Sequence, residues 1–155
     1  MAETLTKTAV IGSPINHSLS PSIHNYWIKK NKIKSDVYQK IKIDALELNK
    51  KIHNLINDGF IGLNVTIPLK EHAFNICEEL SETSKKLKAV NTLTFKNGKV
   101  IGNNTDPKGF TNSIDDKIKN TNIIKKKRSC CWCGWISKVC CLCAKYNACK
   151  NNNCK

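Results

Sequence analysis

The sequence has no apolar run that approaches the roughly eighteen residues needed to cross a membrane. Residues 1–8 also lack the apolar segment of a secretory signal peptide. These two absences predict a cytoplasmic protein with no membrane partner. Hydrophobic residues still make up 40% of the 155-residue chain, which is enough for one folded domain and a fragment of another.

Acidic residues are missing from residues 125–155, where eight Lys and Arg residues stand against no Asp or Glu. The preceding part holds 18 basic and 12 acidic side chains, so it carries only +6 of the total charge of +14. Eight of the nine cysteines also lie in this last part. We therefore predict a domain over residues 1–118, with no nucleic-acid partner, and an irregular, basic, cysteine-rich tail over residues 119–155.

Strand and helix patterns alternate along the first part of the chain. Short apolar runs predict strands, and apolar residues at helical spacing predict helices. In chain order these are a strand over residues 6–12, a helix from Ser20, a strand over 36–43, a helix after Asp44 and a strand over 60–67. This alternation favours a parallel sheet with right-handed crossovers. The expected fold is an α/β three-layer sandwich with a mostly parallel sheet.

The segment after the third strand continues the same kind of pattern. Residues 70–80 have apolar side chains at helical spacing and predict a helix, with Cys77 as a small buried residue. Asn97 and Gly98 are a strong signal for a two-residue turn and predict a hairpin within residues 89–102.

Polar side chains stand at the end of the third predicted strand. Asn64 and Thr66 fall at period two, so they lie on one face of that strand. Pro68 cannot donate to a sheet and ends the strand just before Lys70 begins the next predicted helix. Neutral hydrogen-bonding groups beside one titratable amine suit a small, hydroxyl-rich ligand. The simpler alternative is a solvated lysine after an ordinary buried strand.

Two predicted helix starts also carry groups that suit a ligand. Ser18 and Ser20 lie in the turn before the first helix, where backbone amides and the helix dipole favour an anion such as a carboxylate. Simple N-capping is the plainer explanation for Ser20. Asp106 before Pro107 predicts the N-cap of a helix that ends near Lys117. Its carboxylate either caps that helix or reaches a neighbouring lysine.

Four motifs in register along residues 6–118 resemble the substrate domain of shikimate dehydrogenase. They are Gly12-Ser13-Pro14-Ile15-Asn16-His17-Ser18-Leu19-Ser20-Pro21, Asn64-Val65-Thr66-Ile67-Pro68-Leu69-Lys70, Ala89-Val90-Asn91-Thr92-Leu93 and Gly102-Asn103-Asn104-Thr105-Asp106. The resemblance implies an oxidoreductase in which NADPH reduces 3-dehydroshikimate, a small molecule, to shikimate. The sequence does not distinguish shikimate from the similar acid quinate, and it leaves the oligomeric state open.

The resemblance also implies a role for each polar residue. Lys70 and Asp106 would be the catalytic pair. The substrate-binding residues would be Ser18 and Ser20 for the carboxylate, and Asn64, Thr66, Asn91 and Asp106 for the ring hydroxyls. Hydride delivery to a ketone leaves oxyanion charge, which an ammonium group stabilises and quenches by donating a proton. No metal belongs to this set.

The family requires a second domain that binds NADP through a glycine-rich turn. This sequence has no such turn, so we expect the chain to keep the substrate site, to lack the cofactor site and to be inactive on its own. Asp106 is followed by Pro107 and Lys108 before Gly109, a mild departure from the Asp-Gly of the family that leaves the carboxylate intact.

The tail allows three hypotheses. A small binding module with a zinc-binding tail is suggested by two C-x2-C pairs, although they are closer together than usual: Cys130, Cys133, Cys140 and Cys143. An RNA-binding tail is suggested by the basic run at residues 125–128 and two nearby residues, Trp132 and Trp135.

The third hypothesis is a one-base slip of the reading frame near residues 124–131. Without the first base of the Trp132 codon, the following codons permit Gly-Ala-Gly-Gly-Ser-Ala, a glycine turn of the dinucleotide-binding kind. The tail would then be a frameshifted remnant of the NADP-binding domain, and the chain an inactive pseudogene product. Sequencing the coding DNA at this point tests the frameshift hypothesis. Codons that yield no glycine turn in another reading frame would exclude it.

Overall fold

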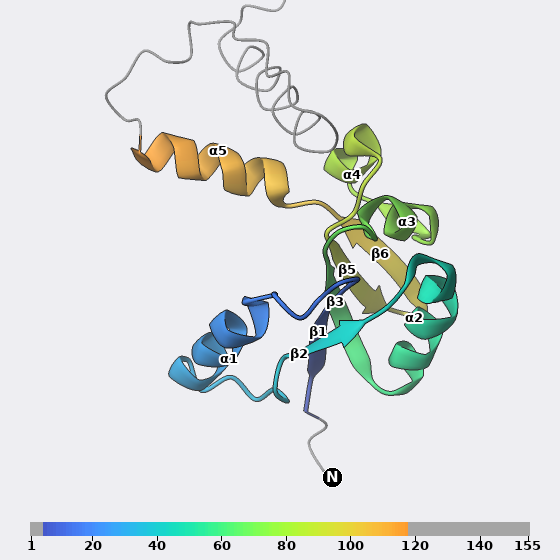
Figure 1. The fold of residues 1–155 in the computed structure, drawn as a ribbon, viewed down its shortest axis with the longest axis horizontal. Coiled ribbons are helices and arrows are strands. Elements are labelled where there is room, and N and C mark those ends of the chain that lie inside the picture. Colours follow the sequence, from blue (N-terminus) through green and yellow to red (C-terminus); the bar gives the residue numbers. More distant parts are fainter. Residues whose placement is uncertain (1–4, 118–155) are drawn as a thin grey trace, which may run out of the picture. The chain divides into compact units, whose positions relative to one another are not determined.

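The fold is given by a computed structural model that describes residues 5–117 (Figure 1). The backbone divides into two compact units, Met1–Asn104 and Thr105–Lys155. Within the described residues, the first unit carries the whole sheet and the second consists of the helix α5 (Asp106–Lys117).

The elements of the first unit alternate as the sequence predicts over its first half. In chain order they are β1 (Lys7–Gly12), α1 (Ser20–Lys30), β2 (Gln39–Lys42), the 3₁₀ helix η1 (Ala45–Glu47), α2 (Leu48–Asn57), β3 (Phe60–Val65), α3 (Lys70–Asn75), β4 (Glu79–Leu80), α4 (Glu82–Leu87), β5 (Thr92–Lys96) and β6 (Lys99–Asn103).

The six strands form one sheet in the order β2-β1-β3-β5-β6-β4. β1 pairs in parallel with both β2 and β3, and β4 pairs in parallel with β6. β5 is antiparallel to both of its neighbours, β3 and β6. Among the described strands, β5 alone therefore runs against the others. The predicted α/β fold with a mostly parallel sheet is confirmed.

Helices cover both faces of the sheet (Figure 1). Ala9 and Ile11 of β1 belong to the main core together with the buried residues of α2. Val10, between them, packs instead with Tyr38 and with Ile28 of α1. Successive residues of a strand point to opposite faces, so α2 and α1 lie on opposite sides of the sheet. This is the three-layer arrangement that the sequence predicts.

The predicted helix over residues 70–80 is wrong in its second half, because α3 ends at Asn75. The Glu78 amide donates to the Val100 carbonyl at 3.0 Å, and the Ser81 amide donates to the Gly102 carbonyl at 3.0 Å. These bonds add β4 to the sheet beside β6. Pairing with a distant strand outweighs the local helical spacing, and the sequence patterns predicted neither β4 nor α4.

Cys77 lies in the turn between α3 and β4, where it packs against the main core. Its thiol donates to the Ala73 carbonyl at 3.0 Å. Burial, with a smaller contribution from the charge of Glu78, raises the pKa of Cys77 to about 12. The thiol therefore stays protonated at neutral pH and acts as a small packing group.

The second strand is shorter than the sequence predicts, because β2 begins only at Gln39. Just before it, the Asn25 side chain of α1 takes up both backbone groups of Tyr38. The Tyr38 amide donates to Asn25 Oδ1 at 2.7 Å, and Asn25 Nδ2 donates to the Tyr38 carbonyl at 3.0 Å. Backbone groups satisfied in this way are not available to a neighbouring strand.

Asn97 and Gly98 form the hairpin turn between β5 and β6, as predicted. Both residues have positive φ, 53° and 74°. A turn with two residues in this conformation matches the right-handed twist of the strands that it joins.

Gly62 lies where β3 passes close to β5. A Cβ at this position would lie 2.7 Å from the backbone oxygen of Leu93, which cannot move aside as a flexible side chain can. We therefore expect Gly62→Ala to lower the free energy of unfolding by about 1–3 kcal/mol, the usual cost of overpacking. Urea denaturation measures this change.

Gly109→Ala is the matched control for this experiment. Among the described residues, nothing lies within 4 Å of a Cβ at Gly109. Alanine in a helix is favoured over glycine by about 1 kcal/mol, so the control should leave stability unchanged or raise it. An unfolding midpoint for Gly62→Ala equal to that of the unmodified chain would contradict the close approach of the two strands.

Candidate functional site

Three of the polar residues singled out in the sequence, Asn64, Thr66 and Asn91, lie at one end of the central strands. Asn64 of β3 pairs in register with Val10 of β1 and with Thr92 of β5, and Thr92 pairs with Asn103 of β6. β1, β3 and β6 run in the same direction, so this row lies where all three strands end. In open α/β sheets, ligands bind outside the carboxyl ends of parallel strands.

Main-chain hydrogen bonds join these strand ends beyond the regular pairing. The Thr66 amide donates to the Ile11 carbonyl at 2.9 Å, and the Val65 amide donates to the Asn91 carbonyl at 2.8 Å. The Asn91 amide in turn donates to the Asn103 carbonyl at 3.0 Å. Thr66 and Asn91 are therefore held at the same edge as Asn64 by the backbone itself.

Gly12, at the end of β1, makes room for Thr66. A Cβ on Gly12 would lie 2.5 Å from Thr66 Cγ2 and 3.1 Å from the Ile67 carbonyl oxygen. A larger residue there would displace the segment that follows β3. The first and second sequence motifs therefore meet through this glycine.

Lys70 is the first residue of α3, as the sequence predicts. Its carbonyl accepts a hydrogen bond of 2.9 Å from the Val90 amide. This bond ties the start of α3 to the residue before Asn91. The backbone of Lys70 is thus fixed next to the segment that carries Asn91.

Asn64 is half-buried, and its side chain has a partner that the sequence analysis missed. The Tyr38 hydroxyl donates to Asn64 Oδ1 at 2.6 Å. Burial raises the pKa of Tyr38, so the hydroxyl keeps its proton and remains a donor. Tyr38 was visible as an aromatic residue in the second predicted strand, but no local pattern connects it to a residue on β3.

The Tyr38 ring is itself held by α1. It stacks on the His24 ring with centroids 4.2 Å apart and an angle of 10° between the planes. His24 also meets Trp27 edge to face, with centroids 5.7 Å apart. Together with the two hydrogen bonds between the Asn25 side chain and the Tyr38 backbone, these contacts fix the position of the tyrosine hydroxyl.

Ser18 and Ser20 lie in the turn that leads into α1, but Ser20 is not the N-cap. It is the first helical residue, and Leu19, with a helical conformation, takes the cap position without a side-chain hydrogen bond. Ser18 Oγ accepts a hydrogen bond of 3.3 Å from the Ser20 amide. Leu19 follows the helical path, so the helix begins one residue earlier than predicted, and Ser18 Oγ bonds the amide of its first residue.

The same turn is tied to β2 and to the segment that follows it. Lys40 Nζ donates to the Asn16 carbonyl at 2.9 Å, and Ser13 Oγ donates to Asp44 Oδ1 at 2.6 Å. Asp44 therefore binds the turn, and its side chain makes no capping hydrogen bond at the start of η1. The serines lie on a turn that is anchored on both sides.

Asp106 begins α5, as its first residue rather than as its N-cap. Because α5 belongs to the second unit, the pairing of Lys70 with Asp106 stays a prediction. The ligand roles of Ser18, Ser20, Asn64, Thr66 and Asn91 stay predictions as well.

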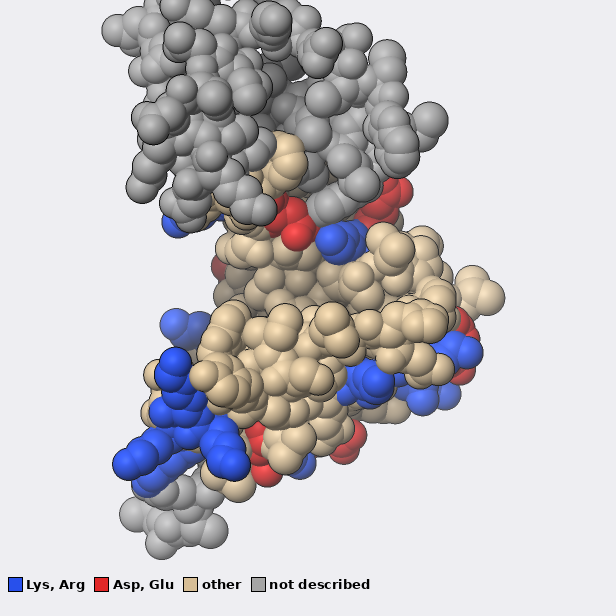
Figure 2. Space-filling view, turned by 60° about the vertical axis from the view of Figure 1, so that its left-hand side comes forward, with Lys and Arg blue, Asp and Glu red and all other residues tan. Residues whose placement is uncertain are grey.

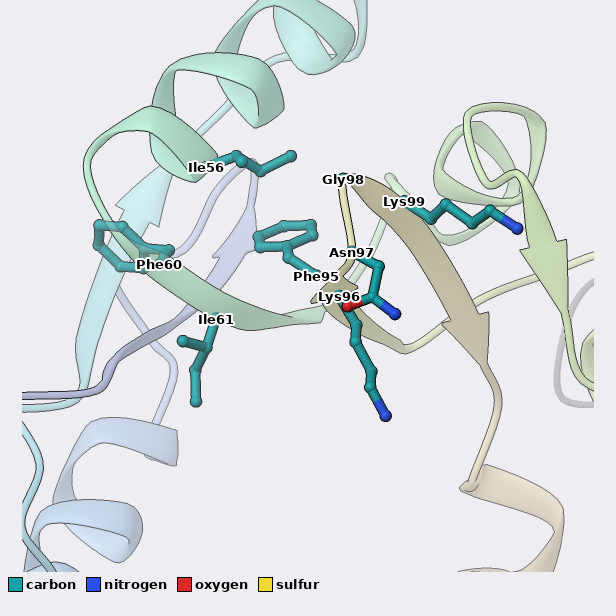
Figure 3. Close-up of a pocket in the computed structure, with 8 residues that line it drawn as sticks. All are labelled: Ile56, Phe60, Ile61, Phe95, Lys96, Asn97, Gly98 and Lys99. Carbon is teal, nitrogen blue, oxygen red and sulfur yellow. The ribbon is translucent and has the colours of Figure 1, made fainter.

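A separate surface hollow lies at the other end of β3 (Figure 3). It is lined by Ile56, Phe60, Ile61, Phe95, Lys96, Asn97, Gly98 and Lys99. Phe60 begins β3, whereas the candidate site lies at the opposite end of the strand, from Asn64 onward. Figure 3 shows Lys96 and Lys99 extending away from the apolar side chains of the hollow. It therefore offers an apolar surface without a reactive group and does not belong to the candidate site.

Charged side chains are unevenly spread on the face shown in Figure 2. Lys and Arg gather at the lower left of this view, smaller groups of them lie at its right, and the broad area between these groups carries no charge. The last turn of α1 holds Lys29 and Lys30, where positive charge is favoured by the helix dipole. This face of the described part therefore has no continuous basic track of the kind that follows a nucleic-acid backbone.

Among the described residues, no three His, Cys, Asp or Glu side chains are arranged to hold a metal ion. The described helices also include none that is long and apolar enough to span a bilayer. The zinc, RNA and shifted-frame hypotheses concern the tail, which lies outside the described residues.

Comparison with known proteins points to one family. The chain matches the shikimate dehydrogenase substrate binding domain over residues 10–93. A shikimate dehydrogenase (NADP(+)) from Pelagibacter ubique is 42% identical over 120 residues, which cover 77% of this chain and 44% of that protein.

Solved structures give the same result. Shikimate dehydrogenase from Aquifex aeolicus has a TM-score of 0.80 at 30% identity, over 94% of this chain and 54% of that one. Shikimate 5-dehydrogenase from Listeria monocytogenes, in complex with shikimate and NAD, has a TM-score of 0.77 at 26% identity, over 91% and 48%. The chain thus spans about half the length of the relatives that it matches.

His24 should make the stability of the fold depend on pH. Burial lowers its pKa from the ordinary value of 6.5, so the unfolded chain binds a proton more readily than the folded chain does. The free energy of unfolding should therefore decrease as the pH falls through 6.5, until the folded-state pKa is passed. Urea denaturation from about pH 7 to about pH 5 measures this slope.

His24→Phe keeps an aromatic ring against Tyr38 and removes the titrating group, so the slope should become smaller. His53→Gln on the exposed side of α2 is the control and should keep the original slope. Equal slopes for the unmodified chain and His24→Phe would contradict the assignment.

Proposed function

Because the chain belongs to the shikimate dehydrogenase family, we propose that residues 1–118 bind shikimate and 3-dehydroshikimate, the acids that the family interconverts. The observation that carries this proposal is the gathering of Asn64, Thr66, Lys70 and Asn91 at one sheet edge by main-chain hydrogen bonds. The complex of the Listeria relative with shikimate supports the choice of ligand.

Neutral amides and hydroxyls are the right groups for a ring with several hydroxyls. Each ring hydroxyl taken out of water needs a hydrogen-bond partner, because an unmet one costs about 1–3 kcal/mol. In this proposal the side chains of Asn64, Thr66 and Asn91 supply those partners. Shikimate and quinate differ little in this respect, so quinate is the competing ligand to test.

The carboxylate of the ring acid is assigned to Ser18 and Ser20. Their turn leads into α1, whose first amides and dipole favour negative charge. Ser20 Oγ is a further donor at the first helical position. Since Ser18 Oγ already accepts from the Ser20 amide, its proton is available to a carboxylate.

Lys70 and Asp106 are assigned the proton transfer. Reduction of the ketone leaves negative charge on its oxygen, and the ammonium group of Lys70 would stabilise that oxygen and donate a proton to it. The carboxylate of Asp106 would keep the Lys70 ammonium group oriented. These two residues are the ones expected to act on the reacting carbonyl.

The described residues do not fit NADP, the cofactor of the family. A dinucleotide needs a strand-to-helix turn with several glycines, so that the backbone can approach the pyrophosphate. The turn between β1 and α1 has Gly12 followed by Ser13 and Pro14, with no second glycine. We assign no hydride step to these residues, whose part is to bind the ring acid, orient it and move a proton.

Shikimate binding to the full 155-residue chain tests the proposal. Thr66→Val removes one hydroxyl with little change of shape and should weaken binding by about fivefold to tenfold, the value of one hydrogen bond. Isothermal titration calorimetry with shikimate, and then with quinate, measures the dissociation constants.

Thr94→Val is the matched control, because Thr94 is exposed on β5 away from the strand ends. Its dissociation constant should equal that of the unmodified chain. Absence of any shikimate binding by the unmodified, folded chain would refute the proposed function.

We also expect the chain alone to give no sustained reduction of NADP with shikimate, since its sequence has no glycine-rich turn. The absorbance of NADPH over time measures this. Turnover that continues beyond one equivalent of enzyme, and that disappears in Lys70→Met, would show that the chain carries a working cofactor site.

A further inference from the structure

The Asn64 side chain is presented with a defined polarity. A side-chain amide has one accepting oxygen and one donating nitrogen, and rotation by half a turn exchanges them. The Tyr38 hydroxyl donates to Asn64 Oδ1 at 2.6 Å, so the oxygen side is already occupied. Among the described residues, no group bonds Asn64 Nδ2. The nitrogen side is therefore the one left for a ligand.

The tyrosine that sets this polarity cannot easily move. Tyr38 is only 3% exposed. Its ring is stacked on His24, and both of its backbone groups are bonded to the Asn25 side chain. The Tyr38 hydroxyl donates its proton to the Asn64 amide oxygen. Burial raises the pKa of Tyr38, so the hydroxyl keeps this proton at neutral pH.

We propose that Tyr38 is a positioning residue that locks the Asn64 amide with Nδ2 toward the ligand, so that Asn64 recognises a hydrogen-bond acceptor on the ring acid. This inference rests on the proposed function for its ligand. It adds that the oxygen atom of a ring hydroxyl, and not its proton, meets Asn64. It also extends the site to α1, whose residues His24 and Asn25 hold the tyrosine.

Tyr38→Phe tests the lock, because it removes the hydroxyl and keeps the ring. The amide should then sample both orientations, and shikimate should bind about twofold to tenfold more weakly in calorimetry. In the Asn64→Ala background the same substitution should have no further effect, because Tyr38 acts only through Asn64. Tyr26→Phe, on a residue that is 57% exposed, is the control and should bind as the unmodified chain does.

Asn64→Asp tests the polarity. The Tyr38 hydroxyl would bond one carboxylate oxygen and leave the other, an acceptor, facing the ligand. If the ligand group is an acceptor too, Asn64→Asp should bind at least as weakly as Asn64→Ala. Tighter binding by Asn64→Asp than by Asn64→Ala would overturn the inference, because Asn64 would then face a donor.

A measurement without ligand separates the inference from the proposed function. The side-chain NH₂ signals of Asn64, assigned in a ¹⁵N spectrum by their loss in Asn64→Ala, should shift in Tyr38→Phe and stay in place in Tyr26→Phe. Unshifted signals overturn the lock whatever binds. If the signals shift but the unmodified chain binds no shikimate, the positioning of Asn64 by Tyr38 is supported, and the proposed function and the ligand assignment are refuted.

An equal loss of affinity from Tyr38→Phe with and without the Asn64 side chain would reveal a general packing role of Tyr38 and overturn the inference.

Discussion

The hydrogen bond from the Val65 amide to the Asn91 carbonyl is the contact on which the candidate site depends. It joins the end of β3 to the segment before β5, where one strand runs against the rest of the sheet. The bonds from Thr66 to Ile11 and from Asn91 to Asn103 extend the connection to β1 and β6. Since all of these groups belong to the main chain, sheet pairing sets the spacing of the polar side chains before any of them contacts a ligand.

The chemistry of the edge follows from which of its groups are already satisfied. Asn64 Oδ1 receives the Tyr38 hydroxyl, and Asn91 Oδ1 receives the Thr92 hydroxyl at 2.9 Å. The oxygen of each amide is thus engaged within the protein, and for Asn64 this leaves Nδ2 as the group that would donate to a ligand in the proposed site. A ring that carries hydroxyls offers oxygen lone pairs at several positions, and such a ring fits donors that are fixed in direction. Preorganised donors also lose less entropy on binding than freely rotating ones.

Local sequence patterns predicted the elements that pair with near neighbours. β1, α1, α2, β3 and the β5–β6 hairpin follow from apolar periodicity and from the turn residues Asn97 and Gly98. The end of α3, the strand β4 and the shortened β2 did not follow, because each is decided by a partner distant in sequence, such as Val100 for Glu78 or Asn25 for Tyr38. The same limit applies to the site. The motifs picked out Asn64, whereas its partner Tyr38 is found only when the fold brings the two together.

The backbone and the side chains of this edge divide their tasks. Thr66 and Asn91 use main-chain groups to hold the sheet together and keep their side chains at the strand ends. A substitution that changes only the side chain therefore changes what the edge can bind and leaves the pairing intact. A proline at position 91 would instead remove the amide bonded to Asn103 and so disturb the spacing of every neighbouring group. Tyr38 is the exception among these residues, because its side chain serves the fold through its ring and the edge through its hydroxyl.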